Sequence, residues 1–308
     1  MKAIMYHYVR QFDNDLPNFR FLDVDNFEKQ LDFFQEKFGF VSKDEWLNVI
    51  KKKKLESLKG KVLLTFDDAL ACHYEYVFKV LKRRGLWGVF YVPTQPYQKD
   101  KVLDVHRIHL LCGAFDGSQL LTALKASLDE NMIPDEKRKE FQEQTYTRQD
   151  NYEGVSEFKR ILNYFVSYEY REDLIDSVAY KLNYLFQTSK FYVPLEKLKQ
   201  MQLAGNIIGS HSISHRVMSK LSKIDQHSEI NDSFGYLRAN IKLDLKTYCH
   251  PYGGFHSFNE QTVKALEESG VDFSFNVESR DICDDDLTSS IQFLPRYDCN
   301  EFPFGKAS

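Results

Sequence analysis

Short apolar runs alternate along this chain with segments of helical periodicity, and this alternation constrains the fold more than any other feature of the sequence. Strands followed by helices in this way are the sequence form of repeated βα units, which build a parallel sheet. Runs such as KVLLTF contain almost no polar residues, and this favours strands that are covered on both faces. Seven strands are predicted, at residues 3–8, 62–66, 88–92, 206–210, 247–250, 272–277 and 291–294.

Helical segments lie between these strands, at residues 25–39, 71–85, 195–205 and 259–270. Three of them close on Gly85, Gly205 and Gly270, where a left-handed C-cap is expected because glycine has no Cβ. Strands and helices that alternate in this order predict an α/β fold, built as a parallel sheet or barrel.

The region from about 100 to 195 interrupts the alternation. It is charged and helical in pattern, as LDENMIPDEKRKEFQEQ (128–144) and REDLIDSVAYKLNYLFQ (171–187) show. The sequence contains no internal repeat and no low-complexity linker. We therefore predict a single barrel domain over residues 1–308, with this region as a helical insertion that forms a subdomain.

Composition and charge limit the classes of function. The 308 residues are 43% hydrophobic and 15% aromatic, which is typical of a folded globular protein, and a net charge of −4 gives no electrostatic footprint for nucleic acid. The five cysteines form no CxxC pair, which favours a reducing compartment over a disulfide framework. The N-terminus lacks the apolar stretch of a secretory signal, and no segment approaches the roughly 20 apolar residues of a membrane span. We expect a soluble, cytoplasmic protein.

Polar residues follow most of the predicted strands directly, where the functional loops of a parallel α/β barrel collect. They are His7, Asp67, Asp68, His211, His215, His250, Tyr252, Arg296 and Asp298.

The segment HSISH places His211 and His215 four residues apart, so that a tight loop can aim both at one ion. Two surface or helix-capping histidines would give the same pattern. The paired carboxylates of TFDD favour a metal site over this alternative, because two imidazoles, one carboxylate and an open position form a catalytic zinc site. One aspartate would then bind the cation while the other takes a proton from water. The alternative for Asp68 is the N-cap of the next helix.

Three motifs in order, TFDD, HSISH and HPYGG, resemble those of the polysaccharide deacetylase family, also called carbohydrate esterase family 4, which includes chitin and peptidoglycan deacetylases. The opening MYHYV resembles a subgroup of that family, and the similarity spans the chain except the insertion. The resemblance implies a distorted (β/α) barrel of seven strands. It implies that Asp68, His211 and His215 bind a divalent metal ion, most simply Zn²⁺, that Asp67 is the general base, and that the backbone N–H of Tyr252 helps to hold the oxyanion.

Two positions depart from the family pattern. The third motif of the family usually begins with an arginine that orients the base, but Cys249 stands there, so Arg296 is our candidate for that charge. A surface ion pair with Asp298 is the alternative for Arg296. The family's histidine acid is missing from IQFLPRYDCN, and His7 or His250 is a candidate for its role, although each would also suit a packed core.

These observations predict a metal-dependent hydrolase that removes an N-acetyl group from an acetamido sugar, an intermediate of surface polysaccharide synthesis in the cytoplasm. Hydrolysis of another acyl group, such as O-acetyl or formyl, is one alternative. A non-catalytic sugar-binding protein on the same fold is another, although a retained Asp67 argues against it. His73 lies in a helical run and is predicted to pack there without a catalytic role.

Overall fold

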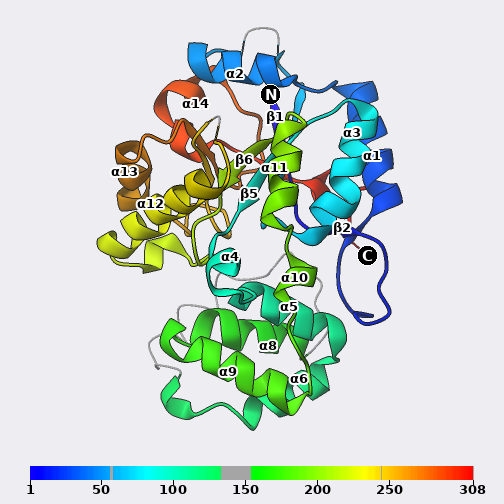
Figure 1. The fold of residues 1–308 in the computed structure, drawn as a ribbon, viewed down its shortest axis with the longest axis vertical. Helices are drawn as coiled ribbons and strands as arrows, with labels where there is room; N and C mark the ends of the chain where they lie inside the picture. The colour runs from blue at the N-terminus through cyan, green and yellow to red at the C-terminus, as the bar shows by residue number, and fades with distance from the viewer. Residues whose placement is uncertain (56–57, 133–153, 244, 308) are drawn as a thin grey trace. The chain divides into compact units, whose positions relative to one another are not determined.

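The computed structural model describes residues 1–55, 58–132, 154–243 and 245–307 (Figure 1). They form two compact units. The first comprises Met1–Gln11, Phe21–Lys101 and Thr188–Ser308, and the second comprises Phe12–Arg20 and Val102–Gln187. Residues 133–144 of the charged stretch that was predicted to be helical lie outside the described residues.

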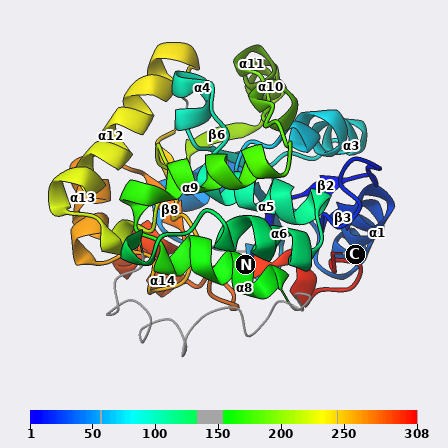
Figure 2. The same cartoon turned by 90° about the horizontal axis from the view of Figure 1, so that it is seen from below.

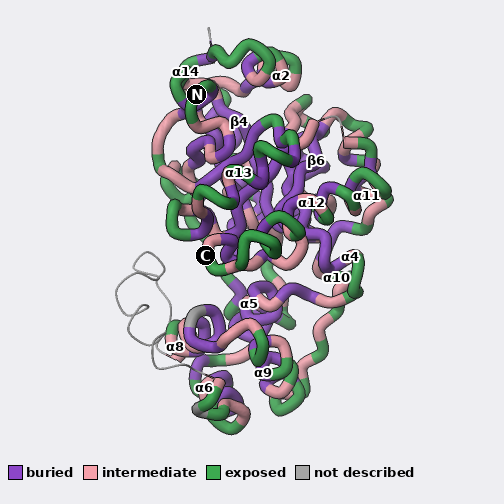
Figure 3. Tube along the Cα trace, turned by 90° about the vertical axis from the view of Figure 1, so that its left-hand side faces the viewer, coloured by how far each residue is buried: buried purple, intermediate pink, exposed green. Residues whose placement is uncertain are grey.

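A sheet of seven parallel strands forms the centre of the first unit, in the order β8-β7-β6-β5-β4-β1-β9. The strands are β1 (Lys2–Tyr6), β4 (Val62–Phe66), β5 (Val89–Val92), β6 (Ile207–Ser210), β7 (Thr247–Cys249), β8 (Phe273–Phe275) and β9 (Tyr297–Asp298). Every residue of β4, β5 and β6 is buried, and Figure 3 draws β4 and β6 in the purple of buried residues. The prediction of strands covered on both faces is confirmed.

One short segment near the end of the chain closes the sheet. Leu294 forms a parallel bridge with Phe275 of β8, and three residues later β9 pairs with β1, with Ile4 opposite Tyr297. The segment 294–298 therefore meets both edges of the sheet. The predicted distorted (β/α)7 barrel with a helical insertion is confirmed.

The position predicted for the last strand is wrong. Ile291–Phe293 forms a 3-10 helix, η6, and the seventh strand of the sheet is β9. The side chain of Gln292 explains the difference, because it is buried and its Nε2 donates to the carbonyl of Val271 at 2.6 Å. The apolar run IQFL thus buries a carboxamide in a helical turn.

Helices surround the barrel. They are α1 (Val24–Lys37), α2 (Lys43–Lys52), the π-helix η2 (His73–Phe78) with α3 (Lys79–Arg84), α4 (Gln95–Lys99), α10 (Thr188–Phe191), α11 (Leu195–Leu203), η5 (Met218–Lys220), α12 (Lys223–Asn240), α13 (Glu260–Glu268), α14 (Asp284–Ser289) and η7 (Cys299–Glu301). The expected helix ends are confirmed, since Gly85, Gly205 and Gly270 have φ of 64°, 102° and 65°. A small parallel pair, β2 (Val9–Arg10) and β3 (Leu22–Asp23), was not predicted.

Successive residues of β4 belong to different clusters of buried side chains, because side chains alternate across a strand. Leu64 packs with Phe27 and Phe34 of α1, whereas Leu63 packs with Tyr91 of β5. Thr65 has the same parity as Leu63, and so does Asp67 just beyond the strand. This alternation places Asp67 on the face of β4 that includes Leu63.

The second unit is helical. Its elements are α5 (Asp104–Ala114), α6 (Gly117–Lys125), η3 (Glu130–Met132), α8 (Val155–Arg160), η4 (Ile161–Phe165) and α9 (Tyr168–Lys181). Helices α5, α6, α8 and α9 pack around a core that includes Ile108, Leu120, Phe158 and Ile175 (Figures 1 and 2). None of the described helices in either unit is long and apolar enough to cross a membrane.

Phe12–Arg20 joins this unit through the glycine of α5. A Cβ on Gly113 would lie 2.6 Å from the ring of Phe19, and the carbonyl of Gly113 accepts a hydrogen bond from the Asn18 N–H at 2.9 Å. Only glycine allows such a close approach.

Candidate metal centre and catalytic residues

The predicted site residues lie where the barrel strands end. Asp67 and Asp68 follow β4, and His211 follows β6, with His215 four residues later. All four side chains are buried. The buried histidines do not fit the alternative of a surface pair. The alternative for Asp68 does not fit either, because the residue at the N-cap of the next helix, η2, is Cys72.

The loops that present these residues share an uncommon backbone conformation. Asp68, Ser212, His215 and Tyr252 have φ of 80°, 64°, 57° and 66°, in the left-handed region that L residues rarely adopt. Such conformations cost of order 1–3 kcal/mol each and cluster at functional sites. Each of the three sequence motifs therefore contains at least one strained residue.

Asp68, His211 and His215 converge on one point. The Nε2 atoms of both histidines lie 3.5 Å from Oδ1 of Asp68. Two ligands bound to a tetrahedral ion by bonds of about 2.1 Å lie about 3.4 Å apart, so these atoms are spaced as ligands of one cation. Aspartate oxygen and imidazole nitrogen are also the donors that zinc accepts. The residues present therefore fit a divalent metal ion.

A backbone carbonyl on the side away from Asp68 orients the ring of His211. Its Nδ1 lies 2.8 Å from the carbonyl oxygen of Cys249, which directs Nε2 toward Asp68. Burial lowers the pKa of His211 in spite of the nearby carboxylates of Asp67 and Asp68. A neutral imidazole is the form that binds metal, and a hydrogen bond on the other ring nitrogen fixes the tautomer.

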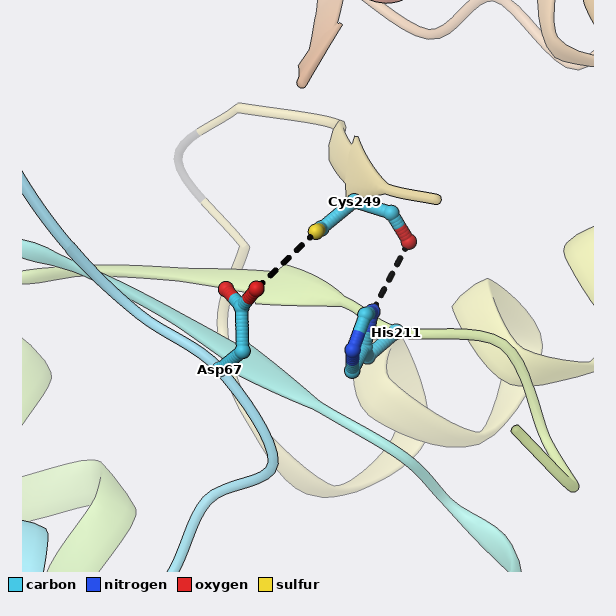
Figure 4. Close-up of side chains that lie close together, drawn as sticks. All are labelled: Asp67, His211 and Cys249. Carbon is cyan, nitrogen blue, oxygen red and sulfur yellow. Dashed lines mark hydrogen bonds between the residues drawn. The ribbon is translucent and has the colours of Figure 1, made fainter. Parts of the chain in front are cut away.

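A second group of potential ligands, Asp67, His211 and Cys249, also lies within 4.8 Å (Figure 4). Figure 4 shows the Cys249 thiol directed at Asp67 and the Cys249 carbonyl directed at His211. The guanidinium of Arg296 already binds both carboxylate oxygens of Asp67, at 2.9 and 2.8 Å. Because a cation in this group would lie beside that buried positive charge, the set around Asp68 is the better metal site.

Asp67 and Arg296 form a buried, bidentate ion pair. Arg296 also donates to Oγ1 of Thr65 at 2.9 Å and to the carbonyl of Asn276 at 3.2 Å, so hydrogen bonds to four oxygen atoms hold the guanidinium plane. Burial opposes ionisation of Asp67, but Arg296 outweighs burial and lowers the pKa of this carboxyl to about 2. A guanidinium with no exposed surface does not fit the alternative of a surface pair with Asp298.

Cys249 occupies the space beside this pair. Its Sγ lies 2.9 Å from a guanidinium nitrogen of Arg296 and 3.4 Å from Oδ2 of Asp67. Burial raises the pKa of the Cys249 thiol well above its usual value, although Arg296 opposes the rise. The thiol is therefore a neutral neighbour of the pair, and the arginine arrives from the segment that closes the barrel.

The two candidate acids lie in different surroundings. Nε2 of His7 lies 3.9 Å from Oδ2 of Asp68, and its side chain is 38% exposed. His250 is buried, stacks on Phe258 with ring centroids 4.1 Å apart, and contacts the carbonyl of Gln292 through Nε2 at 2.8 Å. Burial lowers the pKa of His250 to about 4. His7 thus lies beside Asp68 and reaches solvent, whereas His250 is enclosed in the core.

Tyr252 lies beside the candidate metal ligands, with its ring centroid 4.9 Å from that of His215. The glycine after it fixes the loop, because a Cβ on Gly253 would lie 2.2 Å from Cγ2 of Val277. The role of the Tyr252 N–H in holding an oxyanion remains a prediction.

Two further residues hold the loops of the site and were not predicted to do so. Glu229 of α12 accepts hydrogen bonds from the loop between His211 and His215. His73 is buried in a helix, as expected, and its Nε2 lies 2.7 Å from the carbonyl of His7. The sequence offers no motif for either contact, because in each a helix side chain binds backbone groups of another segment.

The structure therefore combines a parallel α/β barrel with a buried Asp/His/His set next to an ionised Asp–Arg pair. The family model for polysaccharide deacetylase matches residues 177–274, which include HSISH and HPYGG. The resemblance to the polysaccharide deacetylase family is confirmed.

Solved structures share the fold over almost the whole chain. The deacetylase PplD of Streptococcus pyogenes, in complex with acetate, is 15% identical, with a TM-score of 0.60 over 97% of this chain and 91% of that one. A de-N-acetylase of Aggregatibacter actinomycetemcomitans is 14% identical, with a TM-score of 0.51 over 96% and 93%. IcaB of Ammonifex degensii is 15% identical, with a TM-score of 0.51 over 89% and 82%. The chain has no significant match among curated proteins.

Proposed function

We propose that this protein is a metal-dependent carbohydrate de-N-acetylase that hydrolyses the acetamide of an amino sugar. The observation that carries the proposal is the convergence of Asp68, His211 and His215 beside Asp67, whose charge is held by Arg296. A divalent cation such as Zn²⁺, bound by the first three residues, would polarise the amide carbonyl and make water a stronger nucleophile near neutral pH.

Asp67 acts as the general base. Because Arg296 lowers its pKa to about 2, the carboxylate is ionised at every pH at which the protein is expected to work. The same guanidinium fixes the direction of both carboxylate oxygens, so Asp67 is presented to a water molecule in one orientation. General base catalysis of this kind typically contributes about 10²–10⁴-fold to the rate.

His7 donates a proton to the departing amine. It follows β1 in the loop contacted by His73, it lies 3.9 Å from Asp68, and it is partly open to solvent, from which it can be reprotonated. Imidazole is the side chain most easily poised near neutral pH. The N–H of Tyr252 completes the set by donating to the carbonyl oxygen as it gains negative charge.

The product of the proposed reaction is acetate, the ligand named for the similar PplD structure. We propose a small acetamido sugar as substrate, an intermediate of surface polysaccharide synthesis in the cytoplasm. O-acetyl or formyl substrates stay open alternatives, and the mass change of the product distinguishes them. A sugar-binding protein without activity is disfavoured, because binding alone does not need an ionised base beside the metal ligands.

The test compares acetate release by protein that a chelator has stripped of metal with release by the same protein after it has been reloaded with Zn²⁺. Acetylated nucleotide sugars and chitin oligomers serve as substrates, and release only from the oligomers would overturn the small-substrate part of the proposal. Asp67→Asn should abolish turnover but keep the metal content. Asp232→Asn, which neutralises an exposed aspartate of α12, is the matched control. Full turnover by Asp67→Asn, or wild-type protein that binds no metal, would refute the mechanism.

A further inference from the structure

Glu229 holds the loop that carries both histidine ligands. This residue belongs to α12, which packs against β6 (Figure 1). Its Oε2 accepts hydrogen bonds from the N–H groups of Ile213 at 2.8 Å and Ser214 at 2.9 Å, and its Oε1 accepts from the hydroxyl of Ser214. One carboxylate therefore accepts hydrogen bonds from three donors on two adjacent residues of the loop.

The opposite side of the loop is held by the backbone after β5. The carbonyl of Ser212 accepts from the N–H of Thr94 at 3.2 Å, and the carbonyl of Ile213 accepts from the N–H of Gln95 at 3.0 Å. The carbonyls and the N–H groups of the loop are thus bound by different elements. Glu229 supplies the acceptor oxygens for the N–H groups of the loop, and without it two partly buried N–H groups would lose their acceptor.

The loop needs such support because its backbone is strained. Ser212 and His215 both have positive φ, 64° and 57°, and each such conformation costs of order 1–3 kcal/mol. His215 follows Ser214 directly, so any relaxation at Ser214 moves the imidazole relative to that of His211. Successive N–H groups that bind one anionic acceptor are a stable arrangement, since hydrogen bonds to a charged group are stronger than neutral ones.

We propose that Glu229 is a positioning residue that sets the spacing of His211 and His215 for the cation. The inference rests on the proposed metal site and assigns to Glu229 no contact with metal or substrate. Groups that orient metal ligands from behind typically contribute about 10–100-fold to metal affinity, and Glu229 acts on the backbone that carries both histidines.

The experiment measures the affinity of the metal-free protein for Zn²⁺ by competition with a chelator, without substrate, and records the visible spectrum of the Co²⁺ form. Glu229→Ala should bind Zn²⁺ about 10–100-fold more weakly and show a changed Co²⁺ spectrum. Glu229→Gln keeps one acceptor oxygen and should lose less of its affinity for Zn²⁺ than Glu229→Ala. Asp232→Ala removes a carboxylate from the exposed face of the same helix and should match the wild type.

A double-mutant cycle of Glu229→Gln with Ser214→Ala adds a readout that general destabilisation does not produce. The losses of affinity should be smaller than additive, because Ser214 and Glu229 share a hydrogen bond. If Glu229→Ala does not fold, these two milder variants decide the question.

Wild-type affinity in both Glu229 variants would overturn the inference and leave the proposed function intact. An equal loss in Asp232→Ala would also overturn it, because the effect would then follow from charge alone. Wild-type protein that binds neither ion would overturn the inference together with the proposed function.

Discussion

Replacing Arg296 with methionine (Arg296→Met) leaves the buried carboxylate of Asp67 without its counter-ion. Methionine is a shorter, unbranched apolar side chain, and the guanidinium lies over the rings of Tyr91 and Phe275, so methionine keeps part of the apolar packing. The perturbation removes the charge together with the hydrogen bonds to Asp67, Thr65 and Asn276. Breaking a buried pair by removing one partner costs about 3–5 kcal/mol, and we expect a loss of this size in the free energy of unfolding at pH 7.

The pH dependence follows from the pKa of Asp67. In the wild type this pKa falls from 3.8 to about 2, so the pair contributes about 2 kcal/mol at neutral pH that is lost as the pH falls through about 2. In Arg296→Met only the weaker effects of His211 and His7 oppose burial, and we expect the pKa of Asp67 to rise above 3.8. The folded variant then prefers the protonated acid, and its stability falls as the pH rises. The difference between the two proteins should grow from acid toward neutral pH.

Urea unfolding in the presence of a chelator, between pH 4 and pH 7, measures this difference without a contribution from metal. The double variant Asp67→Asn/Arg296→Met removes both charges and should be more stable than Arg296→Met alone. A loss below about 1 kcal/mol at pH 7, or additive effects in the double variant, would refute the view that this pair is a coupled, buried ion pair.

Three further predictions concern the same site. His7→Ala should lower kcat by about 10²–10⁴-fold with little change in Tm. His250→Ala should lower the free energy of unfolding by about 1–3 kcal/mol, because the ring is packed in the core. The reverse pattern in kinetics and urea unfolding would exchange the roles of the two histidines. Gly209→Ala places a Cβ 2.6 Å from Tyr91 and 2.8 Å from the carbonyl of Thr247, so it should both destabilise the fold and weaken Zn²⁺ binding, and wild-type values for both would contradict the packing of β6. Zn²⁺ at 100 times its Kd should raise the free energy of unfolding by about 2.7 kcal/mol, which a chelator should abolish; an unchanged Tm would show that the folded chain binds no ion.

Much of the candidate site follows from position along the chain. In a parallel barrel the residues after each strand meet at one edge, so Asp68 and His211 were expected to converge although 142 residues separate them. The same rule predicted Arg296 near Asp67. The rule does not account for the position of Arg296, because this residue precedes β9 and does not follow a strand; its long side chain reaches Asp67 from the segment that closes the barrel.

Other features had no local signal. Two-residue strands such as Val9–Arg10 are too short for any periodicity, and the π-helix at His73–Phe78 keeps the apolar pattern of an α-helix. Glu229 looks like an ordinary polar position of α12, since its partners are backbone N–H groups that exist in every residue. Contacts between a side chain and a distant backbone segment leave no trace in residue type.

The barrel-closing segment 294–298 couples two features that separate parts of a chain could supply. The residues up to the end of β8 already include both aspartates and both histidines of the candidate site, but not the arginine that neutralises Asp67. The same segment also pairs with β1 and bridges to β8. The contacts that close the barrel and the contacts that hold the charge of Asp67 therefore come from the same five residues, and a deletion of this segment would remove both.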